Sequence, residues 1–261
     1  MPAIRFESMS RPLYCRPCAF DFFAAQLPLL DSDDAAALVN AAIAISMHEL
    51  EHVDPRAASC TLQRLADEVC RRVPHQVQQL NGPLPPGSSP MQLACAAEAV
   101  MAHLHHVLFE EFGLRGNAED YYNPMNSYIP AVLATRRGVP ITLSLIYKVV
   151  AQRLGLRVHG VNAPGHFLAA VELPAASGGI SLMYVDAFTC GNVLTREEAF
   201  ARIEQAIGRS LRRDVSLLAF ASPRQWLGRM LQNLQNIFAF KGRETDLAAM
   251  REMQSLLSLP C

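Results

Sequence analysis

The sequence carries almost no net charge and has no apolar run of membrane length. Its 261 residues include 23 Lys and Arg against 24 Asp and Glu, which gives a formal net charge of -1 at pH 7. Without a basic excess, nothing drives the chain toward phosphate backbones, so we expect no nucleic-acid partner. The richest apolar stretch, residues 35–47, is interrupted by Asn40 and is too short for a membrane span, so we expect no membrane partner either.

The cysteines are irregularly spaced. The seven cysteines are odd in number and scattered, which argues against a disulfide framework and favours reduced thiols in the cytoplasm. Residues 1–11 lack the apolar segment of a secretory signal. What the chain does have is apolar material: 51% of the residues are hydrophobic, enough for a large core in one extended domain or in a core with an appendage.

The hydrophobic pattern predicts an α+β protein in three segments: a helical N-terminal region (1–116), a mixed core (117–221) and a helical hairpin (222–261). In the core, residues 121–130 have the composition of a polar, aromatic loop. The expected helices cover residues 35–50, 58–73, 90–112 and 141–154, together with the chain from Thr195, where Glu198 completes a capping box. Strands are expected at 157–161, 167–173 and 180–188, with Gly178 and Gly179 turning the second strand into the third.

The last segment predicts two helices, 224–240 and 244–257, joined at Lys241 and Gly242. This pair is similar to one tetratricopeptide-type unit, although a single unit has no neighbour to stack on. We expect a hairpin that packs on the main domain, with a partner-binding groove as the alternative. Its inner face would consist of Trp226, Leu231, Leu234, Ile237 and Phe238.

Three patterns resemble metal or redox sites. His48-Glu49-Leu50-Glu51-His52 matches the zinc-peptidase pattern, in which two histidines one helical turn apart bind zinc and the glutamate activates water. Asp54-Pro55 follows at once and is expected to end the helix, and no third ligand is evident. A polar, solvated helix end is therefore the preferred interpretation, and no metal or cofactor is expected. Cys15 and Cys18 form a lone pair expected in a loop, and His103, His105 and His106 fit an ordinary helix surface.

The stretch between residues 123 and 186 is the most informative. His166 begins one predicted strand, and Asp186 ends its hairpin partner, so the two side chains are expected to lie side by side. A carboxylate that accepts from an imidazole N–H fixes the tautomer and raises the basicity of the ring. Many such pairs only satisfy each other in a partly buried place, so a structural role stands beside a catalytic one.

The segment NPMNSYIPAVLATRRGVPITLSLIYKVVAQRLGLRVHGVNAPGHFL, with the later YVDAF, resembles the SirB-type transglutaminase-like proteins of bacteria. The resemblance implies a papain-type fold in which a cysteine at a helix N-terminus attacks a carbonyl. Histidine and aspartate follow on neighbouring strands, and His166 and Asp186 match them. The superfamily cysteine precedes the glycine that ends its helix by fifteen positions, and fifteen positions before Gly155 stands Pro140.

Proline has no thiol, no hydroxyl and no backbone N–H, so Pro140 can neither attack a carbonyl nor stabilise an oxyanion. Ser144, Thr142 and Cys190 are the possible substitutes. Ser144 faces the same way one turn deeper in the helix, Thr142 points elsewhere, and Cys190 approaches from the side of the aspartate. The expected cleft would also be lined by Asn126, Tyr128 and Phe167.

The sequence therefore favours a bacterial, cytoplasmic protein without cysteine-type catalysis that binds another protein or has a regulatory role. Its oligomeric state stays open. The alternative is an amide hydrolase or acyltransferase that uses His166 and Asp186 with a non-standard nucleophile or without a covalent step. A zinc hydrolase built on His48 and His52 is the third hypothesis.

Overall fold

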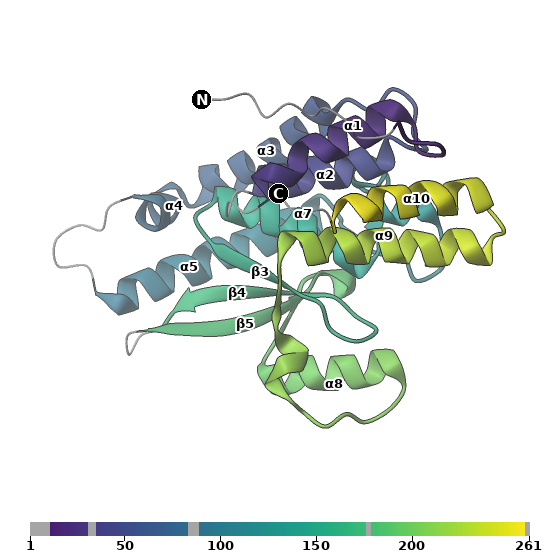
Figure 1. Ribbon diagram of the computed structural model, residues 1–261. Coiled ribbons are helices and arrows are strands. Elements are labelled where there is room, and N and C mark those ends of the chain that lie inside the picture. Colours follow the sequence, from purple (N-terminus) through teal and green to yellow (C-terminus); the bar gives the residue numbers. More distant parts are fainter. Residues whose placement is uncertain (1–10, 31–34, 83–88, 176–178, 259–261) are drawn as a thin grey trace.

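The computed structural model describes residues 11–30, 35–82, 89–175 and 179–258. They form helices around a small sheet, which confirms the predicted α+β class (Figure 1). The helices are α1 (Pro17–Gln26), α2 (Ala35–Ser46), α3 (Pro55–Arg72), α4 (Pro74–Asn81), α5 (Pro90–His105), α6 (Ile129–Thr135), α7 (Pro140–Arg153), α8 (Arg196–Ile207), α9 (Pro223–Phe240) and α10 (Glu244–Leu256). The strands are β1 (Arg115–Gly116), β2 (Arg137–Gly138), β3 (Arg157–Val161), β4 (Leu168–Pro174), β5 (Ile180–Asp186), β6 (Asn192–Leu194) and β7 (Phe220–Ala221).

The main sheet is antiparallel, with strand order β6-β5-β4-β3-β7, and it separates two apolar clusters. Because side chains alternate along a strand, Ala169 and Val171 of β4 join the large cluster with α7. Leu168 and Ala170 point the other way, into a small cluster covered by α8. Figure 1 shows α8 on that side of the sheet, and Leu218 from the segment after α8 joins the same cluster. Strands β1 and β2 form a separate parallel pair.

Helix α7 lies at the centre of the large cluster. Every residue from Pro140 to Ala151 is buried, so the helix is apolar on nearly every side, as a core helix should be. Pro140 occupies the first helical position, where its missing N–H costs no hydrogen bond. Gly155, with φ of 86°, follows the end of the helix as predicted. The buried ammonium of Lys148 donates to the carbonyl of Val158 at 2.5 Å.

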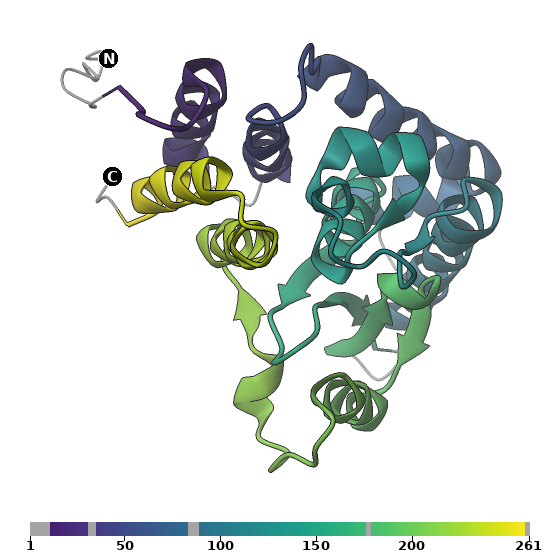
Figure 2. The ribbon, with the colours of Figure 1, turned by 90° about the vertical axis from the view of Figure 1, so that its right-hand side faces the viewer.

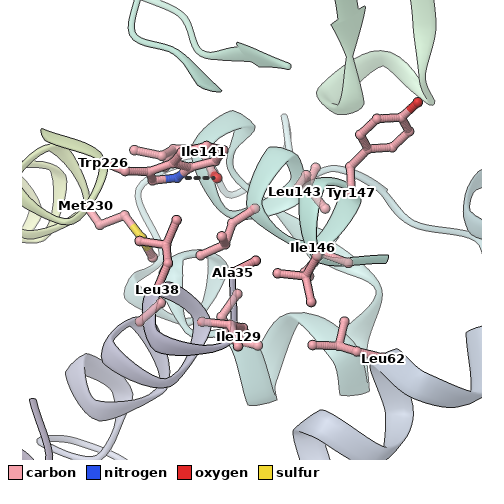
Figure 3. Packing of buried hydrophobic residues seen from close by; sticks show 14 of the residues in the cluster. Ala35, Leu38, Leu62, Ile129, Ile141, Leu143, Ile146, Tyr147, Trp226 and Met230 are labelled. Carbon is pink, nitrogen blue, oxygen red and sulfur yellow. Dashed lines mark hydrogen bonds between the residues drawn. The ribbon is translucent and has the colours of Figure 1, made fainter. Parts of the chain in front are cut away.

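Trp226 of α9 joins the C-terminal hairpin to this centre (Figure 3). Its indole Nε1 donates to the carbonyl oxygen of Ile141 at 3.3 Å, and its ring centroid lies 4.7 Å from that of Phe167. The large cluster runs from Cys15 to Leu256, so all three predicted segments contribute to one core. The domain boundaries 1–116, 117–221 and 222–261 remain predictions.

The hairpin formed by α9 and α10 also brings the two ends of the described chain together. It packs against α1 and α2, and Figure 2 shows the yellow hairpin beside the purple helix. The carboxylate of Glu252 accepts from the backbone N–H groups of Leu13, Tyr14 and Cys15 at 2.8 to 3.2 Å. All five residues predicted for the inner face of the hairpin are buried.

Several predicted boundaries are wrong. Cys18 lies in α1, not in a loop, and Pro55 begins α3, where Asp54 caps the helix. The predicted loop 121–130 runs into α6. α1, α4 and α6 are short helices with weak local signals, and their buried apolar residues hold them in place. The expected helix at 90–112 changes to a π-helical segment, η2, at His106–Glu111. Gly178 of the expected turn lies outside the described residues.

Within the described residues, no helix combines the length and the apolar character that crossing a bilayer requires. The six cysteines in this part of the chain are all free thiols. Cys15 is buried, and burial, with a contribution from Glu252, raises the pKa of its thiol to about 12. That thiol is therefore a poor nucleophile at neutral pH.

The packing around Trp226 gives a stability test. A Cβ on Gly160 would lie 2.3 Å from the Trp226 ring and 2.8 Å from the Phe167 ring. We expect Gly160→Ala to lower the free energy of unfolding by about 2–3 kcal/mol, because the crowded rings must move. Urea denaturation followed by fluorescence measures the change.

Gly228→Ala in α9 is the matched control. Its Cβ would meet only a Leu257 methyl carbon at an ordinary 3.7 Å, and alanine is the better helix former. We expect this variant to be more stable by about 0.5–1 kcal/mol. Equal effects of the two substitutions would show that the packing around Gly160 is not as described.

Candidate functional site

His166 and Asp186 lie together at the end of the main sheet. Strands β4 and β5 pair in antiparallel register, Ala169 opposite Val185, so the start of one lies beside the end of the other. His166 Nε2 is 3.0 Å from Asp186 Oδ2, and the two side chains are only 7% and 1% exposed. The juxtaposition expected from the sequence is therefore present.

Asp186 has two further partners that the sequence did not reveal. Its Oδ2 accepts a hydrogen bond from Arg202 Nε at 2.6 Å, and its Oδ1 accepts from the backbone N–H of Phe188 at 3.0 Å. Arg202 belongs to α8, on the sheet face opposite α7. His166 Nε2 lies within ion-pair distance of Asp186 Oδ2, but the direction of its N–H does not meet the geometry of a hydrogen bond. Asp186 thus caps the short helix that follows it and forms ion pairs with His166 and Arg202.

The charges around Asp186 decide its protonation state. Burial alone would raise the pKa of this carboxyl group, but the imidazole of His166 and the guanidinium of Arg202 outweigh burial and lower the pKa below its usual value. The group is a carboxylate at neutral pH. Because Arg202 already compensates its charge, less of that charge is available to stabilise an imidazolium at His166. Nε2 points at Asp186, so Nδ1, on the opposite side of the imidazole ring, faces away from the carboxylate.

The helix that leads toward this pair carries no activated nucleophile. Pro140 is buried at the start of α7, behind the N-cap Val139. The hydroxyls of Ser144 and Thr142 are fully buried and have no hydrogen-bond partner among the described residues. An isolated buried hydroxyl has no base to take its proton. Cys190 is exposed and follows the short helix η4 (Ala187–Thr189) with a left-handed φ of 56°.

Asn126 and Tyr128, the predicted cleft residues, make their hydrogen bonds elsewhere. The Asn126 amide donates to the carbonyl of Asp120 at 2.6 Å and accepts from Asn117 Nδ2 at 2.9 Å, so it organises its own loop. The Tyr128 hydroxyl donates to Glu49 Oε2 at 2.8 Å. Burial, with added repulsion from Glu49, raises the pKa of Tyr128 well above its ordinary value. Phe167 packs on Trp226 and lies beside His166 in the chain.

The zinc-like pattern does not form a zinc site. His48 and His52 lie in the turn after α2, and His52 has a left-handed φ of 58°. Glu51 and His52 are exposed, as expected for a solvated segment, but His48 is buried. Its Nε2 contacts Asp246 Oδ1 at 2.9 Å, and its Nδ1 accepts from the Arg16 N–H at 3.5 Å. Glu49 binds Arg243 Nη1 at 2.9 Å. No cluster of three potential metal ligands occurs in the described part of the chain.

His105 and His106 have partners of their own, and neither His166 nor Asp186 lines any of the three described cavities. His105 Nε2 contacts the Tyr147 hydroxyl at 2.9 Å, and burial lowers its pKa to about 4. His106 lies beside Glu110 and Glu111. A cavity of about 700 Å³ lies between α3 and η2. Arg71 and Arg72 in its lining are paired with Glu68, whereas Arg64 and Asp67 bond, among the described residues, only to the neutral side chains of Thr61 and Gln63.

The ion pair predicts a pH-dependent stability. Arg202→Gln should lower the free energy of unfolding at pH 7 by about 1.5–3 kcal/mol, since a buried carboxylate loses a charged hydrogen bond. The pKa of Asp186 is depressed in the folded protein, so this stabilisation is present above about pH 4 and is lost as the pH falls through the folded value. Denaturation at pH 7 and pH 3 measures the difference. The exposed pair Arg213–Glu204 gives the control Arg213→Gln, expected to cost less than about 1 kcal/mol.

The two histidines of the zinc-like pattern are expected to behave differently. His48→Ala removes a buried partner of Asp246 and should destabilise the protein by about 1–3 kcal/mol. His52→Ala changes an exposed residue and should stay within about 0.5 kcal/mol. Thermal unfolding with and without a chelator checks both. Equal losses that added zinc reverses would contradict this account.

Comparison with known proteins gives the family. A family model described as the transglutaminase-like superfamily matches residues 56–232. A UPF0162 protein of Xylella fastidiosa (strain 9a5c) is 38% identical over 146 residues, which cover 55% of this chain and 50% of that protein. A UPF0162 protein of Pseudomonas aeruginosa is 27% identical over 230 residues, or 87% of this chain and 74% of the relative.

F-box only protein 21 of Mus musculus is 32% identical over 160 residues, which cover 60% of this chain and 25% of the mouse protein. The chain thus spans about half the length of the Xylella relative and a quarter of the mouse one. No solved structure matches it. The family model covers more than half of the chain, including α7 and the strands that carry the His–Asp pair, and so this protein belongs to the transglutaminase-like superfamily.

Proposed function

We propose that this protein binds a partner, or regulates one, through a transglutaminase-like core that has no cysteine-type catalysis. The observation that carries the proposal is Pro140 at the first position of α7. In the superfamily layout this is the place of the thiol, where helix N–H groups and an imidazolium would stabilise a thiolate. A proline offers neither a nucleophile nor an N–H donor there.

The surroundings of the pair support the same reading. Asp186 caps η4 and is paired with Arg202, and both functions stabilise the fold without any chemistry at His166. The buried hydroxyls of α7 lack a base, so neither Ser144 nor Thr142 replaces the thiol. A His166–Asp186 pair with a structural role is consistent with a protein that binds a partner and does not catalyse a reaction.

Finer assignments belong to the same proposal. The sequence resemblance suggests a SirB-type, bacterial and cytoplasmic protein, and the bacterial UPF0162 relatives are compatible with that suggestion. The α9–α10 hairpin would serve as a tetratricopeptide-like unit whose inner face is taken up by the core. A partner would then meet its outer side. We treat the protein as a pseudoenzyme on these grounds.

The rival function is an amide hydrolase or acyltransferase. The observation in its favour is the 3.0 Å approach of His166 to Asp186, which leaves Nδ1 directed away from the carboxylate. Such a histidine can act as a general base toward a water or a bound hydroxyl. Compensation of Asp186 by Arg202 weakens this reading, because the base loses part of its electrostatic support.

Turnover tests separate the two functions. We expect the wild-type protein to release no ammonia from glutamine-containing peptides and to hydrolyse p-nitrophenyl acetate no faster than His166→Ala, since no nucleophile is paired with the imidazole. His159→Ala is the matched control. His159 is another partly buried histidine of the sheet, 2.8 Å from the carboxylate of Glu172. Turnover that is lost in His166→Ala and kept in His159→Ala would establish the rival enzyme.

A further inference from the structure

A continuous row of aromatic rings leads from the outside of the protein to the His166–Asp186 pair. The Phe240 centroid lies 6.3 Å from that of Tyr122, Tyr122 lies 5.4 Å from Tyr121, and Tyr121 lies 5.9 Å from Phe188. The Phe188 ring meets His166 edge to face at 6.4 Å. We name Tyr121, Tyr122, Phe188 and Phe240 the aromatic surface. Its members come from a loop, from η4 and from the end of α9, so only the fold brings them together.

The outer rings of the aromatic surface are exposed to an unusual degree. Phe240 is 83% exposed, Tyr122 63% and Tyr121 37%, whereas Phe188 is half-buried. Single exposed apolar residues are common, but adjoining exposed rings are typical of surfaces that bind another molecule. Aromatic residues are enriched in the centres of protein interfaces because they bury a large area and lose little entropy.

A positive charge borders the aromatic surface. Arg229 donates to the amide oxygens of Asn162 at 3.0 Å and Asn233 at 3.3 Å, and no carboxylate of the described residues pairs with it. Its charge also reaches Tyr121. Burial raises the pKa of Tyr121, the neighbouring Tyr122 adds to that rise, and Arg229 opposes it. Arg229 is therefore a guanidinium that the described structure leaves uncompensated.

Helix geometry places this charge in line with the rings. Residues 229, 233, 236 and 240 are spaced by four, three and four, so they lie along one side of α9. Eleven residues separate Arg229 from Phe240, which is about 16 Å along the helix. An extended peptide covers that distance with about five residues. Asn233 and Asn236 lie between the two ends, and amide side chains can both donate to and accept from a peptide backbone.

We propose that the aromatic surface binds an extended segment of a partner protein, in which a carboxylate pairs with Arg229 and an aromatic or proline side chain about five residues away stacks on Phe240 and Tyr122. The proposal rests on the proposed binding function and names its surface and the chemistry of its partner. Ring faces provide the apolar contact, and the uncompensated guanidinium selects the acid. The segment would pass beside His166 without reacting.

Selection of displayed random dodecapeptides on the whole chain tests the proposal. We expect enriched peptides to pair Asp or Glu with an aromatic residue or proline at a separation of about five. Synthetic copies are then titrated by fluorescence anisotropy. Phe240→Ala and Tyr122→Ala should each weaken binding at least tenfold. Arg229→Gln should weaken it similarly and abolish the preference for the acidic peptide over its Asp→Asn or Glu→Gln copy.

Control variants change exposed side chains elsewhere on the protein. Val215→Ala removes a side chain that is 63% exposed, and Arg157→Gln removes an arginine whose side chain is 75% exposed. Both should bind the peptides as the wild type does. Because Phe240 and Tyr122 are largely exposed, their alanine variants are expected to fold, and circular dichroism confirms this point.

Each other outcome has a defined meaning. Failure to enrich any peptide, or peptides that bind the Phe240 and Arg229 variants as tightly as the wild type, would overturn the assignment of this surface. A dimer of the free protein that Phe240→Ala dissolves would show that a second copy occupies the rings, and it would also overturn the proposal. Neither result touches the proposed function, which fails only if turnover depends on His166.

Discussion

Helix α7 is buried on nearly every side, and the rest of the structure is arranged around that fact. A helix with no solvated face needs cover from several directions at once. The sheet supplies one side, α2 and α3 supply another, and α9 reaches it through Trp226. The same requirement explains why residues from Cys15 to Leu256 share one cluster.

Two features separate this site from a cysteine-type catalytic centre: the buried start of α7 and the ion pair at the end of β5. Enzymes of this layout need a helix terminus that presents a reactive group to an imidazole. Here that terminus is apolar, and the acid that would orient the imidazole is held by Arg202 and by the Phe188 N–H. The charge and the hydrogen bonds of Asp186 therefore stabilise the fold. The exposed groups nearby are a row of aromatic rings and the guanidinium of Arg229, and the proposed binding role rests on them.

Local patterns predicted the long elements well. The central helix, strands β3, β4 and β5 of the five-stranded sheet and both helices of the hairpin lie within a residue or two of their expected places, because each has a clear periodicity and an evident start or stop. The short strands β6 and β7 were not expected. The short helices α1, α4 and α6 were missed. Each has a proline at its first or second position, a helix-start signal that was recognised only at Pro140. These helices are too short to show a clear hydrophobic periodicity. Tertiary packing stabilises them.

The sequence by itself determined that residue 140 has no reactive group. It also determined that a histidine stands at the start of one strand and an aspartate at the end of its antiparallel partner, since this follows from chain order and strand pairing. Only the tertiary structure decided what surrounds them. Arg202 reaches Asp186 from the far side of the sheet, His48 finds Asp246 almost two hundred positions away, and Phe240 meets Tyr122. Such contacts depend on how separate elements pack, and hydrophobic periodicity carries no information about which polar or aromatic side chains packing will bring face to face.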